Sequence, residues 1–310
     1  MTSFVKKLIN SQKVASAEKS AFSGEKKYIL SINLAVRAKD NLETVEVFIP
    51  QPRNTGYQKV SKSEFSLQPK EILKDFLYDN EVAYWNFSDR RVEVNQKVQV
   101  SVKPRLIESI SGNLADYEKE DEEYKLYAKS DAYFDFENER VFSLAKNLLG
   151  KEQAVGKIAK TFYEYVRDNL KYGNPIEGLY SSKDALDKDV VDCGGYDSLL
   201  GALYRSVGIP SRLVSGLLAG YPGEHMHAWL EFMAPNGTWV PVDPTNEHLR
   251  LAGRDFKPGG FGRVGNDRIV LSYGDDIEIL GRKFPLLQLP VIQGQGNLSV
   301  ERFIETKELK

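Results

Sequence analysis

The chain has one cysteine and three histidines among its 310 residues, so any reactive group they form is easy to define. Cys193 opens the apolar, periodic stretch CGGYDSLLGALYRSVGIP, which predicts a helix that begins at this residue. Unpaired backbone amides at a helix N-terminus stabilise a thiolate, so we expect a lowered pKa for this thiol. Gly194 and Gly195 follow without side chains, which would let a substrate carbonyl approach the backbone. An inert buried cysteine is the alternative.

A histidine leads the next chemically notable segment. His227 begins the run HAWLEF, in which strand alternation places His227, Trp229 and Glu231 on one face. A histidine in this position can direct a neutral imidazole toward a helix end. A structural histidine at a strand edge is the alternative.

An aspartate follows in the strand-like run TWVPVDPT. A two-residue turn at Asn236-Gly237 would set Asp243 opposite Leu230, whereas a five-residue loop over 233–237 would set it opposite His227. Both registers keep the carboxylate near the imidazole. A simple turn starter, with the aspartate accepting local backbone hydrogen bonds, is the alternative.

These three residue types together can perform nucleophilic catalysis. An adjacent imidazole can take the proton of a thiol, and a third group on the other ring nitrogen holds the tautomer and the orientation. Glu231 and Asn246 are the next candidates for that third group. A metal site built from His225 and His227 with Cys193 or Asp243 would have an odd ligand mix, so we predict no metal.

The composition excludes several classes of function. Forty-two basic residues against 44 acidic residues give a formal net charge of -2, so no basic excess exists to bind a phosphate backbone, and nucleic acid is not expected as a partner. The start of the chain contains no apolar run of signal-peptide length, and no run of about 18 apolar residues occurs elsewhere. We therefore expect a cytoplasmic protein without a membrane partner. A single cysteine excludes an intramolecular disulfide.

The hydrophobic pattern changes along the chain from strand to helix and back to strand. Alternation in YILSINLAVRA, VEVFIP and VEVNQKVQVSV predicts an antiparallel β-sandwich or half-barrel from about residue 27 to 110. The acidic stretch 111–129 indicates a solvated linker or an exposed helix face, and an acidic docking site is the alternative. Helical spacing follows over 142–149, 155–170 and 193–207, with Gly208 at a C-cap and Pro210 after it. Strand-like segments come next, which indicates an α+β domain.

Three segments resemble signatures of the transglutaminase-like superfamily, in the same order and at similar spacing. They are VVDCGGYDSLLGALYRSVGIPSRLVSG at 190–216, HAWLE at 227–231 and WVPVDPT at 239–245. The resemblance implies an α+β fold with a papain-like, transglutaminase-like core, in which helices pack on an antiparallel sheet, behind an N-terminal β-sandwich. It also implies a triad of Cys193, His227 and Asp243 that needs no cofactor.

The resemblance implies cysteine-dependent acyl transfer on an amide bond of a protein or peptide, through a thioester. We expect hydrolysis by a peptidase or amidase; protein crosslinking and a catalytically silent binding protein are the alternatives. The Cys193 backbone N–H is one expected oxyanion donor, and the predicted substrate and oxyanion residues are Gly194, Tyr172, Tyr180 and Trp229. The predicted parts are an N-terminal arm (1–26), the β-sandwich (27–125), the catalytic domain (126–285) and a C-terminal strand extension (286–310). The oligomeric state stays open.

Overall fold

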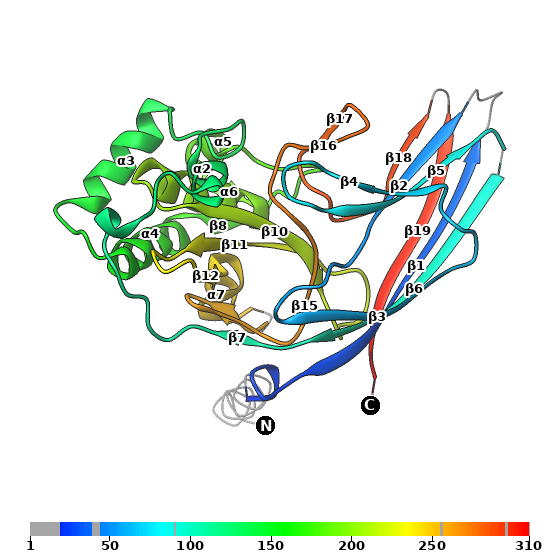
Figure 1. The fold of residues 1–310 in the computed structure, drawn as a ribbon, viewed down its shortest axis with the longest axis horizontal. Coiled ribbons are helices and arrows are strands. Elements are labelled where there is room, and N and C mark those ends of the chain that lie inside the picture. Colours follow the sequence, from blue (N-terminus) through cyan, green and yellow to red (C-terminus); the bar gives the residue numbers. More distant parts are fainter. Residues whose placement is uncertain (1–18, 39–43, 90, 255–256, 295–296, 310) are drawn as a thin grey trace. The chain divides into compact units, whose positions relative to one another are not determined.

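A computed structural model describes residues 19–38, 44–89, 91–254, 257–294 and 297–309 (Figure 1). The chain forms two compact units. Of the described residues, the helical unit contains those in 19–24, 104–213 and 228–266, and the β-rich unit contains those in 25–103, 214–227 and 267–309. Most of the predicted N-terminal arm lies outside the described residues. Among the described residues, no helix has the length and apolar character needed to cross a membrane.

The β-rich unit consists mainly of two antiparallel four-stranded sheets (Figure 1). Their strand orders are β19-β1-β6-β3 and β18-β2-β5-β4. The bounds are β1 (Lys26–Ala38), β2 (Val45–Pro50), β3 (Gln58–Phe65), β4 (Glu71–Lys74), β5 (Glu81–Phe87), β6 (Arg91–Val102), β18 (Val291–Gly294) and β19 (Leu298–Leu309). Alternate residues of β6 are buried, as the period-two pattern predicts, and one apolar core contains side chains of both sheets. The predicted antiparallel β-sheet region before the helices is confirmed.

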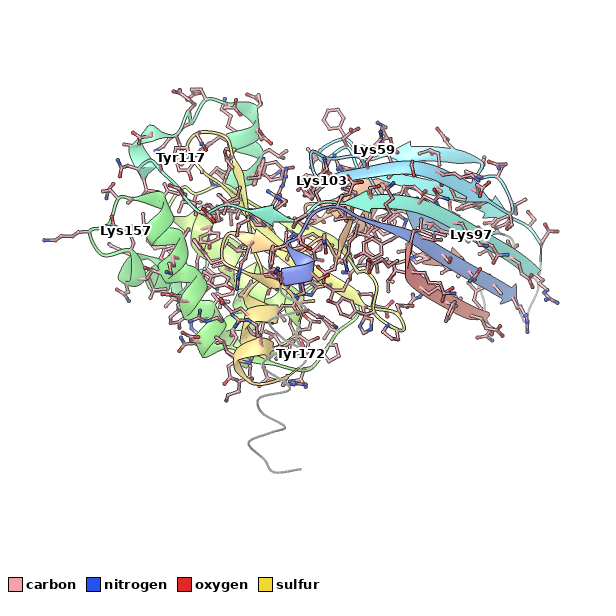
Figure 2. All side chains as sticks on the ribbon, turned by 90° about the horizontal axis from the view of Figure 1, so that it is seen from below. Lys59, Lys97, Lys103, Tyr117, Lys157 and Tyr172 are labelled. Atoms are coloured by element: carbon pink, nitrogen blue, oxygen red, sulfur yellow. The ribbon has the colours of Figure 1, made fainter. Side chains whose placement is uncertain are left out.

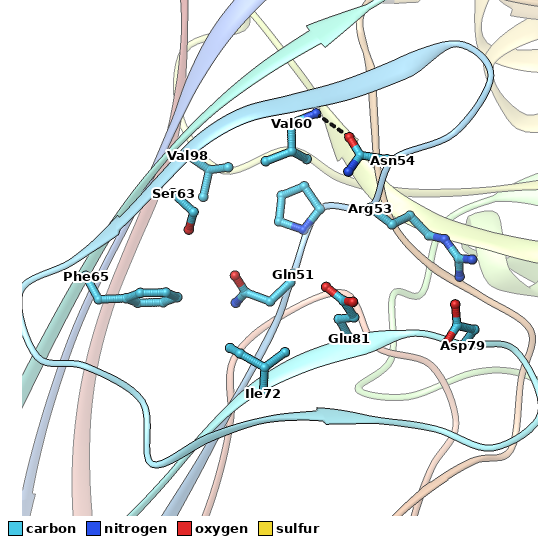
Figure 3. Close-up of a pocket in the computed structure, with 11 residues that line it drawn as sticks. Gln51, Arg53, Asn54, Val60, Ser63, Phe65, Ile72, Asp79, Glu81 and Val98 are labelled. Carbon is cyan, nitrogen blue, oxygen red and sulfur yellow. Dashed lines mark hydrogen bonds between the residues drawn. The ribbon is translucent and has the colours of Figure 1, made fainter.

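A cavity of about 420 Å³ lies within the β-rich unit (Figure 3). Side chains of the edge strands β3 and β4 and of the segment after β2 contribute to its wall, among them Phe65, Ile72 and Arg53. The cavity wall contains no cysteine or histidine. This cavity is therefore separate from the chemistry that the sequence predicts.

The helical unit is built around one buried helix. Its helices are η1 (Leu114–Asp116), α2 (Glu122–Ala128), α3 (Glu139–Leu149), α4 (Val155–Asn169), α5 (Ser182–Lys188), α6 (Cys193–Ser206) and α7 (Pro244–Leu251). Helices α3, α4, α5 and α7 all pack against α6, whose residues from Gly194 to Arg205 are buried. Gly208 follows α6 with a positive φ of 80°, which confirms the predicted helix end. The predicted helices correspond to α3, α4 and α6.

The remaining strands follow or flank these helices. Their bounds are β7 (Arg105–Leu106), β8 (Lys171–Tyr172), β9 (Val190–Val191), β10 (Ser211–Leu218), β11 (Met226–Met233), β12 (Trp239–Val242), β13 (Gly259–Gly260), β14 (Arg263–Val264), β15 (Arg268–Tyr273), β16 (Ile277–Ile279) and β17 (Arg282–Phe284). One sheet has the order β12-β11-β10-β15. The α+β fold with a transglutaminase-like core of helices and sheet is thus confirmed.

The hairpin between β11 and β12 has a register that differs from both predicted registers. Leu230 pairs with Val242, so Asp243 lies one residue beyond the ladder. The Ala234 N–H donates to the Thr238 carbonyl at 2.8 Å, which leaves a three-residue loop, Pro235–Gly237. Gly237 has a φ of 80°, the left-handed conformation that a three-residue hairpin loop requires. Both predicted registers were therefore wrong by one or two residues.

Candidate active site

Cys193 is the first residue of α6, as predicted. The N-cap is Asp192, whose carboxylate accepts hydrogen bonds from the Gly195 N–H at 3.3 Å and the Ile176 N–H at 3.1 Å. The short parallel pair of β8 and β9, in which Tyr172 lies opposite Val191, precedes this cap. Cys193 as a whole residue keeps some exposure to solvent, although the packing around it desolvates the thiol. The helix thus presents the thiol at its N-terminal end, beside a carboxylate.

The two glycines after the cysteine lie in closely packed surroundings. A Cβ atom on Gly194 would lie 2.7 Å from Leu179 Cδ1, and one on Gly195 would lie 2.5 Å from Val191 Cβ. Such distances are too short for real Cβ atoms, so a side chain at either position would displace its neighbour. The approach of α6 to β9 explains Gly195, whereas at Gly194 the end of the flexible Leu179 side chain can move aside. The oxyanion role of Gly194 stays a prediction.

The surroundings of the thiol differ from the sequence expectation. Burial raises the pKa of the Cys193 thiol above its usual value, and the carboxylates of Asp192 and Asp197 act in the same direction. A hydrogen bond from the Ala228 backbone N–H lowers it in part. The expected lowering of this pKa is not found, because burial disfavours the thiolate and because Asp192, which caps the helix, is itself an acid. With its pKa raised above the usual value, the thiol is protonated near neutral pH.

His227 is the second residue of β11 and directly precedes Ala228, whose N–H donates to Cys193. His227 is buried, with only 4% of the residue exposed. Trp229 and Glu231, on the same face by alternation, are fully buried, and so are Leu230 and Phe232 on the other face. Strand β11 is therefore buried on both faces over these residues. This packing fixes the β11 backbone, and with it the position of His227 next to Ala228, whose N–H donates to Cys193.

Asp243 is fully buried and is the N-cap of α7. Its Oδ1 accepts the Asn246 backbone N–H at 3.0 Å, and its Oδ2 accepts Asn246 Nδ2 at 2.8 Å. The Tyr163 hydroxyl lies 3.2 Å from the Asp243 carbonyl and 2.6 Å from Glu247 Oε2. Helix α7 was missed by sequence reasoning, although an Asp-Pro pair is the usual signal of an N-cap and first turn. The carboxylate is thus held by hydrogen bonds within its own helix.

A second buried aspartate, which sequence reasoning also missed, lies on α6. Asp197 is fully buried, and neither of its carboxyl oxygens has a hydrogen-bond partner among the described residues. Burial raises its pKa well above the usual range, and the nearby Asp243 and Asp192 raise it further. No signal in the sequence distinguishes this residue from a solvated polar position on a helix.

The predicted substrate and oxyanion residues do not share one environment in the structure. Tyr172 lies on β8 and is labelled in Figure 2. Burial raises the pKa of its hydroxyl, and the electrostatic influence of Cys193 is the second largest cause of that rise. The Tyr180 hydroxyl donates instead to the Asn174 carbonyl at 2.7 Å. Trp229 is completely buried in β11. Of the two tyrosines, Tyr172 is the one that the structure brings next to the thiol.

Glu231, one alternative orienting group, belongs to a buried ion-pair cluster. Its carboxylate pairs with Arg105 and with Arg212, the latter at 2.7 Å. Although burial opposes ionisation, the two guanidinium groups hold the pKa of Glu231 below its usual range. The Arg212 guanidinium also lies 3.9 Å above the centre of the Trp239 ring. Glu231 therefore has a structural role that accounts for its charge. Asn246, the other alternative, donates to Asp243.

The described residues contain no group of three or more His, Cys, Asp and Glu side chains arranged to hold a metal ion. His225, one of the alternative ligands, places its Nε2 2.7 Å from the Pro222 carbonyl oxygen. This contact gives His225 a partner within its own loop.

Comparison with known proteins gives a family for part of the chain and structures with a similar fold. Residues 143–244, which include Cys193, His227 and Asp243, match the Transglutaminase-like superfamily. The fold resembles that of a protein from Cytophaga hutchinsonii provisionally named a cysteine protease, with a TM-score of 0.67 and 16% identity over 93% of this chain and 92% of that chain. The periplasmic domain of TgpA from Pseudomonas aeruginosa gives a TM-score of 0.40 and 16% identity over 76% of this chain and 92% of that chain. No curated protein matches the sequence.

The chain therefore carries a domain of the transglutaminase-like superfamily. At 16% identity, the likeness to the Cytophaga protein establishes a shared fold over nearly the whole chain and nothing about its reaction.

Proposed function

We propose that this protein is a cysteine-dependent hydrolase that cleaves amide bonds of a protein or peptide through a thioester intermediate. Cys193 is the nucleophile, His227 is the general base and Asp243 orients the imidazole. The supporting observation is the hydrogen bond from the Ala228 N–H to Cys193, because His227 is the residue directly before Ala228. The neutral resting thiol also fits a base that removes the proton during attack.

The proposed reaction has two steps. The Cys193 sulfur attacks the amide carbonyl carbon while His227 takes the thiol proton and then gives it to the leaving amine, so that the C–N bond breaks and a thioester remains. Water then attacks the thioester, its proton passes to His227, and the thiol is released. The Cys193 backbone N–H and the Tyr172 hydroxyl are the proposed donors to the oxyanion.

Alkylation of the single cysteine tests the nucleophile and its base without knowledge of the substrate. We expect iodoacetamide to add one label per chain to the wild type and none to Cys193→Ser. His227→Ala should slow labelling at pH 7 by about 10²-fold, within the usual range for loss of a general base. His225→Ala is the matched control, because it removes a neighbouring imidazole bonded to Pro222. Equal labelling rates in the wild type and His227→Ala would refute the pairing.

Protein crosslinking and silent binding are the alternatives that a second assay separates. A peptide mixture is incubated with the protein and a fluorescent primary amine, and the products are identified by mass spectrometry. New peptide termini indicate hydrolysis, amine-tagged glutamine indicates crosslinking, and neither product indicates a binding protein. We expect new termini, lost in Cys193→Ser. A cytoplasmic location remains a proposal from the sequence, to be tested by cell fractionation.

A further inference from the structure

Asp197 lies on the same side of α6 as the proposed nucleophile. Positions four residues apart on a helix share a face, so the Asp197 side chain follows that of Cys193 by one turn. Its complete burial is unusual for an acid, because buried aspartates are nearly always paired or hydrogen-bonded. Neither oxygen of Asp197 has such a partner within the described part of the chain. A neutral small residue would fill the site without this cost, so the acid calls for a functional explanation.

The neighbours of Asp197 are acids from two directions. Asp243, at the start of α7, and Asp192, before the start of α6, both act on it electrostatically, and both disfavour its charged form. Cys193, on its own helix, is the fourth titratable group of this cluster, since Asp192, Asp197 and Asp243 all oppose formation of its thiolate. Three carboxylates and a thiolate that act on one another in a buried site cannot all be charged at moderate cost.

The two aspartates differ in their hydrogen-bond donors. Asp243 accepts two hydrogen bonds from Asn246 and lies at the N-terminus of α7, where the helix dipole favours a negative charge. Asp197 receives none from the described residues. In a pair of neighbouring carboxyl groups, the proton stays on the group whose surroundings stabilise charge least. The hydrogen-bond donors therefore favour the negative charge on Asp243 and the proton on Asp197.

We propose that Asp197 is a positioning residue that stays protonated while the enzyme works and thereby keeps the charge of the pair on Asp243. This inference rests on the proposed triad. If Asp197 loses its proton at alkaline pH, a second negative charge appears beside Asp243 and Cys193. That charge opposes formation of the thiolate, so Asp197 limits the reactivity of Cys193 on the alkaline side.

The pH dependence of iodoacetamide alkylation tests the proposal. Asn has the shape of a protonated Asp but cannot ionise, so Asp197→Asn should label within about twofold of the wild type at pH 7. Above pH 9 the variant should label faster, by about tenfold for each unit by which the charge of Asp197 raises the pKa of the thiol. Asp187→Asn, which removes an exposed acid of α5 paired with Arg140, should leave the profile unchanged.

Infrared spectroscopy gives a direct readout that does not depend on reactivity. At pH 7 the wild type should show the carbonyl stretch of a protonated carboxylic acid, and Asp197→Asn should lack it. No band that Asp197→Asn removes would overturn the proposal, because Asp197 would then carry no proton at pH 7. Coincident alkylation profiles at a pH where the wild type has lost that band would overturn it as well. Loss of labelling at pH 7 in a folded Asp197→Asn variant would also overturn it, because the charged form would then be the active one. Failure of the triad itself would appear separately, as unchanged labelling in His227→Ala.

Discussion

Replacement of Asp243 by asparagine separates its two roles, the orientation of His227 and the N-cap of α7. The cap role survives the change, since asparagine caps a helix about as well as aspartate. The amide oxygen of the new residue can accept the Asn246 backbone N–H that Oδ1 accepts now at 3.0 Å. The Asn246 side chain can turn its own oxygen toward the new NH₂ group in place of the present 2.8 Å contact. We expect a loss of less than about 1 kcal/mol of stability.

The proposed orienting role does not survive the change. An amide in place of the carboxylate can stabilise the wrong tautomer and does not stabilise an imidazolium, and such a change in a Ser-His-Asp triad lowers turnover by about 10⁴-fold. We expect single-turnover acylation by Asp243→Asn to fall by about 10³-fold or more, while its melting temperature shifts by less than about 4 °C.

Asp243→Ala is the companion variant. It removes the cap and leaves the buried Asn246 amide without its acceptor, so it should lose about 1–3 kcal/mol of stability in addition to turnover. Melting temperature and single-turnover acylation are measured for both variants. Near-normal acylation in Asp243→Asn, together with a destabilised Asp243→Ala, would refute the orienting role and leave Asp243 as a cap alone.

Three further variants test the packing and the charges. Glu231→Gln leaves Arg105 and Arg212 without their buried anion and should lower the free energy of unfolding, measured in urea at pH 7, by about 3–5 kcal/mol. Because the pKa of Glu231 is lowered in the folded state, the difference in stability between wild type and variant should shrink as acid protonates Glu231. A difference that stays constant with pH would contradict this. Gly201→Ala places a Cβ 2.5 Å from the Phe134 ring and should lower the melting temperature despite the better helix propensity of alanine; an unchanged or higher value would mean that the ring moves freely. Asp197 has a raised folded pKa, so the folded state binds more protons than the unfolded state above about pH 4, and stability falls as pH rises. The melting temperature of Asp197→Asn relative to wild type should therefore increase from pH 4 to pH 9, and a flat difference would contradict it.

The elements with the clearest pattern could be predicted from the sequence. Strands β1 and β6 alternate strictly because one face of each is buried, and α6 ends where Gly208 can adopt a positive φ. The hairpin register could not be predicted. A two-residue turn at Asn236-Gly237 and the observed loop Pro235–Gly237 both suit a glycine with positive φ, and the choice depends on the ladder beyond the loop.

The chemistry of the site was less predictable than its residues. The first-turn position of Cys193 followed from local sequence, but the direction of its pKa depends on burial and on acids that tertiary packing brings near. Asp197 has no local signal, since its position is buried only by the tertiary packing of other elements against α6. The cap at Asp243 carried a local signal in the Asp-Pro pair, which the strand pattern before it obscured.

The distribution of protons explains why the same cluster can contain a thiol and three acids. A thiolate formed beside charged Asp192, Asp197 and Asp243 would meet repulsion from each of them, and burial would strengthen that repulsion. Keeping Asp197 neutral removes one of these charges, and the Ala228 N–H offsets part of the rest. In the proposed triad, Asp243 orients the imidazole and His227 takes the thiol proton as the sulfur attacks. A resting thiol with a raised pKa is therefore consistent with nucleophilic catalysis, provided that the base acts in the same step.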